Sequence, residues 1–174
     1  MDPNRLTEKA LDALRAAQAL AVRNGNQQID IEHLLAALLD QDGGLAPAIF
    51  QKAGVNVASI RNRIEQEIAR LPKVSGPSGP PDQIYVTGRL NRLFTQAEDA
   101  ARALKDDYIS VEHLLLPMMD DSGATGRILS EAGLTRDRLM KALAEVRGNQ
   151  RVTSQNPEAT YQALERYGRD LTKL

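Results

Sequence analysis

A seven-residue stretch occurs twice in this sequence, as Ile29-Asp30-Ile31-Glu32-His33-Leu34-Leu35 and as Ile109-Ser110-Val111-Glu112-His113-Leu114-Leu115. The offset of 80 residues also holds outside the stretch, because it aligns Thr7 with Thr87 and places apolar residues and helix stops of the two halves in the same order. A match that agrees with the helix caps and helix stops on both sides indicates an internal duplication and not a coincidence.

The first half of the chain has the apolar spacing of four amphipathic helices. Apolar residues recur every three or four positions, which predicts helices over 7–23, 30–41, 45–53 and 57–70. Thr7 and Asp30 stand where N-caps are expected, and Gly54 fits the left-handed position that closes a helix. Because the second half repeats the pattern, the sequence predicts an all-α fold in which two tandem, pseudo-symmetric four-helix repeats form one globular domain.

Two polar stretches divide the chain. Residues 73–83 contain five Gly or Pro, which predicts a linker over 72–84 between a first repeat at about 4–71 and a second at about 85–147. A second polar stretch, 148–157, predicts another linker. The helical spacing from 158 onward predicts a short C-terminal connector that leads to a domain outside this chain. Linker and connector together span residues 148–174.

One residue conflicts with the helical pattern. Pro117 stands inside the predicted sixth helix, where the first repeat has Ala37. Proline lacks the backbone donor that a helix interior needs, so this helix is expected to be kinked or short.

The composition excludes several classes of function. With 22 Lys and Arg against 23 Asp and Glu, the formal charge of −1 gives no electrostatic basis for binding nucleic acid or a membrane surface. The chain has no cysteine, which excludes disulfides and thiolate zinc sites and favours a cytoplasmic location. No apolar run approaches the ~18 residues of a membrane span, and the start lacks a signal peptide.

The sequence offers no constellation for catalysis or metal binding. Its glycines stand at helix stops, and no glycine-rich turn precedes a Lys-Ser or Lys-Thr pair that would bind phosphates. His33 and His113 each follow a glutamate, but adjacent helical residues point in different directions and no spacing supplies further ligands. We therefore predict no catalytic residue, no metal site and no cofactor in this chain, and a structural role for both histidines at the helix starts.

Four polar residues remain as candidates for binding. Glu32 and Glu112 occupy the second helical position, where a carboxylate is stabilised by the helix dipole by about 0.3–1 kcal/mol; alternatively they form matched acidic spots for basic or extended polypeptides. Thr7 is either only an N-cap or also a binding residue. Asp106 lies in an acidic loop, and this loop either is only solvated or contributes to binding.

The aromatic residues are few. They make up 3% of the chain, and Phe50, Tyr85 and Phe94 are expected to lie in the core or at a seam between helices.

The duplicated helix start, together with Ala-Gly-Val at 53–55 and Ala-Gly-Leu at 132–134, resembles the double Clp N-terminal domain of AAA+ unfoldases over about residues 4–147. The segment 158–172 looks like the one that leads from this domain into the first ATPase module of the ClpB-type disaggregases. The resemblance identifies the chain as the N-terminal part of such a chaperone.

This resemblance implies a function. The parent would be a cytoplasmic, homohexameric ATPase of the stress response that uses ATP and magnesium and works with the DnaK system to extract polypeptides from aggregates. The present chain, a monomer by itself, would recruit unfolded or aggregated polypeptides. The alternative is an adaptor-docking domain of a protease-linked Clp unfoldase.

The resemblance also points to particular residues. Polar positions implicated in disaggregases match Thr7, Asp106 and Glu112, while acidic ligand-binding positions of the protease-linked relatives match Glu32 and Glu112. Those relatives carry Gly-Thr-Glu-His in both halves, and neither half here has the threonine, which argues against their phosphorylated-arginine ligand.

Overall fold

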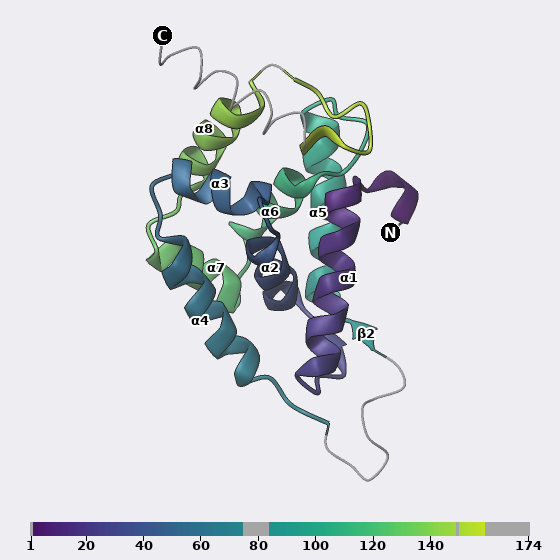
Figure 1. The fold of residues 1–174 in the computed structure, drawn as a ribbon, viewed down its shortest axis with the longest axis vertical. Helices are drawn as coiled ribbons and strands as arrows, with labels where there is room; N and C mark the ends of the chain where they lie inside the picture. Colours follow the sequence, from purple (N-terminus) through teal and green to yellow (C-terminus); the bar gives the residue numbers. More distant parts are fainter. Residues whose placement is uncertain (1, 75–83, 149, 159–174) are drawn as a thin grey trace.

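The computed structural model describes residues 2–74, 84–148 and 150–158, and within them most of the chain is helical (Figure 1). The first repeat contains α1 (Glu8–Arg23), α2 (Ile31–Asp40), α3 (Leu45–Lys52) and α4 (Val57–Ala69). The second contains α5 (Gly88–Ala103), α6 (Val111–Met118), α7 (Ala124–Glu131) and α8 (Arg136–Arg147). The predicted all-α fold of two four-helix repeats is therefore confirmed, with a 3-10 turn at Pro3–Arg5 and two short strands, β1 (Gln28–Ile29) and β2 (Tyr85–Val86), in addition.

The helices begin where their capping residues predict. The Thr7 hydroxyl accepts a hydrogen bond from the Ala10 N–H (3.2 Å), and the Thr87 hydroxyl accepts one from the Leu90 N–H (3.1 Å). Each bond satisfies an amide that the first turn of the helix leaves without a partner. Gly54 has φ = 81°, as expected for a residue that closes a helix in the left-handed region.

Pro117 shortens α6, as predicted. The helix has 8 residues where its counterpart α2 has 10. Pro117 cannot donate a hydrogen bond to the carbonyl of His113, and α6 ends one residue after the proline, at Met118.

The two repeats are linked by reciprocal strand pairing. Ile29 of β1 pairs in parallel with Val86 of β2, and Leu6 pairs in the same way with Ile109. The 80-residue offset relates the two pairs, because it takes Leu6 to Val86 and Ile29 to Ile109. The segment before the first helix of each repeat thus binds the segment before the second helix of the other.

Both repeats contribute to a single core. Figure 1 shows α2 and α6 in the centre, with α1 and α5 on one side of them and α3, α4, α7 and α8 on the other. Contacts cross the repeat boundary symmetrically, since α3 packs on α8 and α4 packs on α7. Residues 31–39 of α2 are all buried, and α1 lies against α2 with buried alanines, which permit a close approach.

Three expectations differ from the structure or lie outside it. Residues 150–157 of the expected linker and Glu158, the first residue of the expected connector, lie against the domain, and Val152 and Glu158 are buried. Phe50 and Phe94 are core residues as predicted, but Tyr85 is 53% exposed because β2 lies at the surface. Most of the predicted linker 72–84 and of the C-terminal connector, residues 75–83 and 159–174, lies outside the described residues.

Candidate functional site

A polar cluster surrounds the start of α2. The Asp30 N–H donates to Nδ1 of His33 (2.9 Å), so the other ring nitrogen, Nε2, carries the proton and donates to Oδ1 of Asn26 (2.9 Å). Oδ1 of Asp30 accepts from the Ile31 N–H (2.8 Å) and from the Thr87 hydroxyl (3.0 Å). The predicted structural role of His33 at the helix start is confirmed, and Asp30 is the N-cap.

Arg89, from α5 of the second repeat, holds the carboxylates of this cluster. It lies 3.0 Å from Oδ2 of Asp30, 3.4 Å from Oε1 of Glu32 and 2.9 Å from Oδ2 of Asp121. Burial raises the pKa of Glu32, and the attraction of Arg89 offsets this only in part. Burial also lowers the pKa of His33, which is therefore neutral at physiological pH.

A second cluster surrounds the start of α6 and repeats the backbone design. The Ser110 N–H donates to Nδ1 of His113 (2.8 Å), and Nε2 of His113 donates to Oδ2 of Asp106 (2.7 Å). Asp106 also receives two hydrogen bonds from Arg147, at 2.6 and 2.8 Å, and Arg147 lies 3.3 Å from Oε1 of Glu112. His113, like His33, thus has a structural role.

Asp106 is buried, so the expectation of a solvated loop is wrong for this residue, although Asp107 next to it is exposed. Burial by itself would raise the pKa of Asp106. The hydrogen bonds from His113, from Arg147 and from the Val152 N–H outweigh burial and hold that pKa well below its usual range. Asp106 is therefore an anion fixed inside the domain.

Glu158 completes the second cluster. Its Oε2 accepts from the Thr7 hydroxyl (2.6 Å) and from the Val111 N–H (3.4 Å), and the residue is 2% exposed. Burial raises the pKa of Glu158 to about 6, and the nearby charge of Glu112 adds to the effect. This residue is the first of the predicted C-terminal connector, and no pattern in the sequence marks it as a partner of Thr7.

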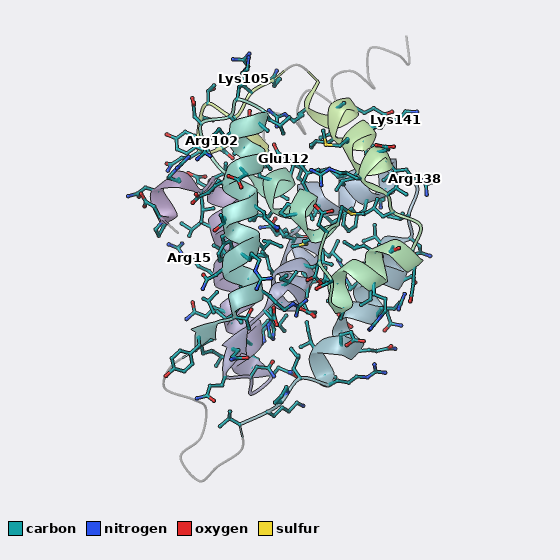
Figure 2. All side chains as sticks on the ribbon, turned by 180° about the vertical axis from the view of Figure 1, so that it is seen from behind. Arg15, Arg102, Lys105, Glu112, Arg138 and Lys141 are labelled. Carbon is teal, nitrogen blue, oxygen red and sulfur yellow. The ribbon has the colours of Figure 1, made fainter. Side chains whose placement is uncertain are left out.

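The structure thus brings three of the four candidate residues into one cluster. Thr7 donates to Glu158, Arg147 donates to both Asp106 and Glu112, and the charge of Glu112 acts on Glu158. Glu32 lies in the first cluster. All four are buried, and Figure 2 shows Glu112 between α5 and α8, with Lys105 and Lys141 nearer the rim of the molecule. Their role in binding stays a prediction.

An apolar groove lies between α1 and α5 and encloses about 290 Å³. The two helices, the segment before α1 and both strands contribute its apolar residues, which are Leu6, Leu11, Leu14, Ile29, Val86, Leu90 and Phe94. Val86 is 41% exposed and Leu11 and Leu14 are half-buried, so apolar surface in the groove is open to solvent. Arg15, labelled in Figure 2, together with Gln18 and Asn91 gives the groove polar edges.

Other kinds of site find no support in the described ranges. Residues 2–74, 84–148 and 150–158 contain no group of His, Asp and Glu side chains suited to hold a metal ion. In the same ranges, none of the helices is long and apolar enough to span a bilayer.

The fold and the two clusters define a class of protein. It is a helical domain of two repeats that pair with each other, in which a histidine caps the second helix of each repeat and an apolar groove lies at the surface. Residues 5–132 match the family described as the Clp repeat (R) N-terminal domain. The chain belongs to this family, and the resemblance noted in the sequence is confirmed.

Sequence relatives of the chain include chaperone proteins named ClpB. The chain is 46% identical over 171 residues to the chaperone protein ClpB of Bacillus anthracis, with 98% of this chain covered, and 47% identical over 173 residues to ClpB of Gloeobacter violaceus, with 99% covered. It spans about a fifth of the length of these relatives, since 20% of each is covered. The domain is thus of the ClpB type.

Two solved structures show the same fold. The N-terminal domain of Hsp104 from Candida albicans aligns with a TM-score of 0.77 at 24% identity, covering 88% of this chain and 98% of that one. The ClpV N-domain in complex with a VipB peptide aligns with a TM-score of 0.64 at 20% identity, covering 81% and 86%.

Proposed function

We propose that this domain recruits unfolded or aggregated polypeptides to a ClpB-type ATP-dependent disaggregase. The observation that carries the proposal is the solvent-open apolar groove between α1 and α5. An extended chain with exposed apolar side chains can bury them in such a groove, and polar edges allow many sequences to bind weakly. The ClpB relatives, named as chaperones, support the same class of ligand.

The remaining parts of the proposal concern the parent protein. ATP and magnesium would act in ATPase modules beyond this domain, in a homohexamer that cooperates with the DnaK system in the cytoplasm during recovery from stress. The domain itself would bind without catalysis and would be monomeric in isolation. Thr7, Glu32, Asp106 and Glu112 would influence binding from below the surface, through the helix starts that position the groove.

The test is a titration followed by backbone NMR. A permanently unfolded probe, reduced and carboxymethylated lactalbumin, is added to the 174-residue chain, and we expect shifts concentrated at Leu11, Leu14 and Val86. Leu14→Ser, in the groove, should weaken binding about tenfold, whereas Val22→Ser, on the same helix and 37% exposed, should leave it unchanged. An unperturbed groove at saturating probe would contradict the proposal.

A second candidate is an adaptor-docking domain of a protease-linked Clp unfoldase. The observation that favours it is the ClpV N-domain, which has this fold and is seen in complex with one defined peptide. A pull-down from native lysate distinguishes the two functions. One folded protein, recovered in stoichiometric amount and not displaced by the unfolded probe, would favour adaptor docking.

A further inference from the structure

The two helix starts differ in the source of one carboxylate. At α2, Oδ1 of Asp30 accepts hydrogen bonds from the Thr87 hydroxyl and from the Ile31 N–H. The second repeat has Ser110 in the position of Asp30 and so has no carboxylate of its own there. Its donors are nevertheless present, since Thr7 and Val111 are the counterparts of Thr87 and Ile31.

Glu158 supplies the missing carboxylate from outside the repeat. Oε2 of Glu158 accepts from the Thr7 hydroxyl at 2.6 Å and from the Val111 N–H at 3.4 Å, which are the two interactions that Asp30 makes in the first repeat. Glu158 reaches this position from 47 residues beyond Val111. A side chain distant in sequence thus does what the N-cap itself does at α2.

Besides Glu158, a small set of contacts attaches residues 150–158 to the domain. Arg147 donates to the Gln150 carbonyl (2.8 Å), the Gln155 side chain donates to the Asn4 carbonyl (3.3 Å), and the side chains of Val152 and Pro157 are buried. The Val152 N–H donates to Oδ1 of Asp106 (2.9 Å), the Val152 carbonyl accepts from the Asp107 N–H (2.8 Å), and the Gln155 carbonyl accepts from the Glu8 N–H (2.8 Å). Residues 153–156 between these points are exposed. Contacts of this kind can be exchanged for water one segment at a time, without disturbing the helical core.

We propose that residues 150–158 form an intramolecular latch, which Glu158 closes over the start of α6 in place of the carboxylate that the second repeat lacks. When the latch opens, two hydrogen-bond donors become accessible. They are the hydroxyl of Thr7, the N-cap of α1, and the N–H of Val111, the first residue of α6. The latch opens as a unit while the helices stay folded.

The surroundings of Glu158 make the latch sensitive to pH. Glu112 on α6 faces Glu158 with a like charge, Arg147 on α8 is paired with Glu112 and Asp106, and Glu8 on α1 is an exposed acid beside Gln155. In the closed latch the pKa of Glu158 is raised from 4.5 to about 6. A raised pKa means that closure favours the protonated form, so the latch is tightest below about pH 4.5 and weakens as the pH rises through about 6, by about 30-fold in total.

Amide hydrogen exchange in the 174-residue chain tests the latch. The protection factors of the Glu8, Asp107 and Val152 amides report three of the hydrogen bonds that attach the segment. Protection factors already correct for the intrinsic pH dependence of exchange. Between about pH 5 and about pH 7.5 we expect them to fall about eightfold together, as the pKa of Glu158 requires. The amides of α2, in the first repeat, should not change with them.

Two variants at Glu158 separate charge from hydrogen bonding. Glu158→Gln keeps an acceptor for Thr7 and Val111 and carries no charge, so protection should be high and should not follow the pH. Glu158→Ala removes the acceptor, and protection should fall at least tenfold at both pH values. Glu145→Gln, which changes an exposed acid on α8, should behave as the unmodified chain does.

Ser110→Asp tests the repeat argument directly. It gives α6 the N-cap carboxylate that α2 has, which should take over Thr7 and Val111 and displace Glu158. We expect the three latch amides to lose protection while the amides of α6 keep theirs.

Two results would overturn the proposal. If Glu158→Ala and Ser110→Asp leave the three amides as protected as in the unmodified chain, Glu158 does not hold the segment. If Glu158→Ala exposes the amides of α2 as well, the segment is part of the cooperative core and does not open as a unit.

Discussion

The start of α2 and the start of α6 have the same backbone design, but the arginine that pairs with their carboxylates comes from a different place in each. In each, a histidine Nδ1 accepts the N-cap N–H, and the other ring nitrogen donates to the side chain seven residues before it, Asn26 or Asp106. At α2 the cation is Arg89, which comes from the other repeat and whose side chain is 34% exposed. At α6 it is Arg147, from the same repeat, whose side chain is 7% exposed.

The comparison shows which features of a duplicated unit are tied to the fold. The histidine closes the helix start through backbone groups, and any helix that begins in this way needs the same interaction. The buried carboxylates at each helix start only need a cation nearby, and Arg89 and Arg147 can supply it from different positions. Substitutions that exchange features between the repeats test this distinction.

The largest effect is expected from Asp106→Asn, which gives the second cluster the residue type that the first has at Asn26. Arg147 now donates two short hydrogen bonds to the Asp106 carboxylate, and in the variant it would remain buried without this anion, which costs about 3 kcal/mol in free energy of unfolding. Urea denaturation at neutral pH measures it. Asp107→Asn, at the exposed neighbour, should change stability by less than about 0.5 kcal/mol, and equal values for the two variants would contradict a special role of Asp106.

The same variant should change the response to acid. Because the pKa of Asp106 is lowered in the folded state, its contribution is complete above the unfolded value of 3.8 and is lost as the pH falls below it. The stability of the unmodified chain should therefore decrease toward low pH more steeply than that of Asp106→Asn. Parallel curves from urea denaturation at several pH values would show that the carboxylate is not held as an anion.

A smaller effect is expected at Gly126 in α7, whose counterpart in α3 is Pro47, because both stand three residues after the N-cap glycine of their helix. A Cβ at Gly126 would overlap the carbonyl oxygen of Asp121, which also holds Arg89 in the first cluster. Gly126→Ala should cost about 1–3 kcal/mol in free energy of unfolding, because the backbone must shift to make room. Thermal denaturation measures the loss.

Gly88→Ala is the matched control. A Cβ at Gly88, at the exposed start of α5, would have nothing within 4 Å, so the substitution should leave stability unchanged or raise it by up to about 1 kcal/mol. A loss at Gly88 as large as at Gly126 would indicate that the carbonyl of Asp121 is not the cause.

The smallest effect is expected where the repeats differ in backbone strain. Lys105 has φ = 58°, and its counterpart in the first repeat is Gly25, with φ = 73°. Lys105→Gly should stabilise the domain by about 0.5 kcal/mol, because the relief of strain exceeds the added entropy of the unfolded chain. Gly25→Ala should destabilise it by about 1 kcal/mol. Chemical denaturation resolves both, and the same sign for both would refute the comparison.

Much of the fold could be predicted because its signals are local. Apolar spacing, the N-caps at Thr7 and Asp30, the helix stop at Gly54 and the break at Pro117 all depend on residues within one or two turns. The shared core followed from the repeat, because two amphipathic units must bury their apolar faces.

The charged partners in the site could not be predicted in the same way. Arg147 reaches Asp106 across 41 residues, and Glu158 reaches Thr7 across 151, so neither contact has a signature in local spacing. One signal was available for Asp106, since the offset of 80 aligns it with Asn26 and both precede a histidine by seven residues. The exposure of Tyr85 depends on β2 lying at the surface, which only the tertiary structure defines.

The reciprocal pairing of Leu6 with Ile109 and of Ile29 with Val86 has a consequence for the ancestry of the domain. A chain with a single repeat would leave both of its pairing segments without a partner, and an identical chain related by a two-fold axis would satisfy both. The present domain is therefore equivalent to a homodimer fused into one polypeptide. Fusion turns a concentration-dependent assembly into an intramolecular folding step, and it frees each former subunit to change its charged residues independently.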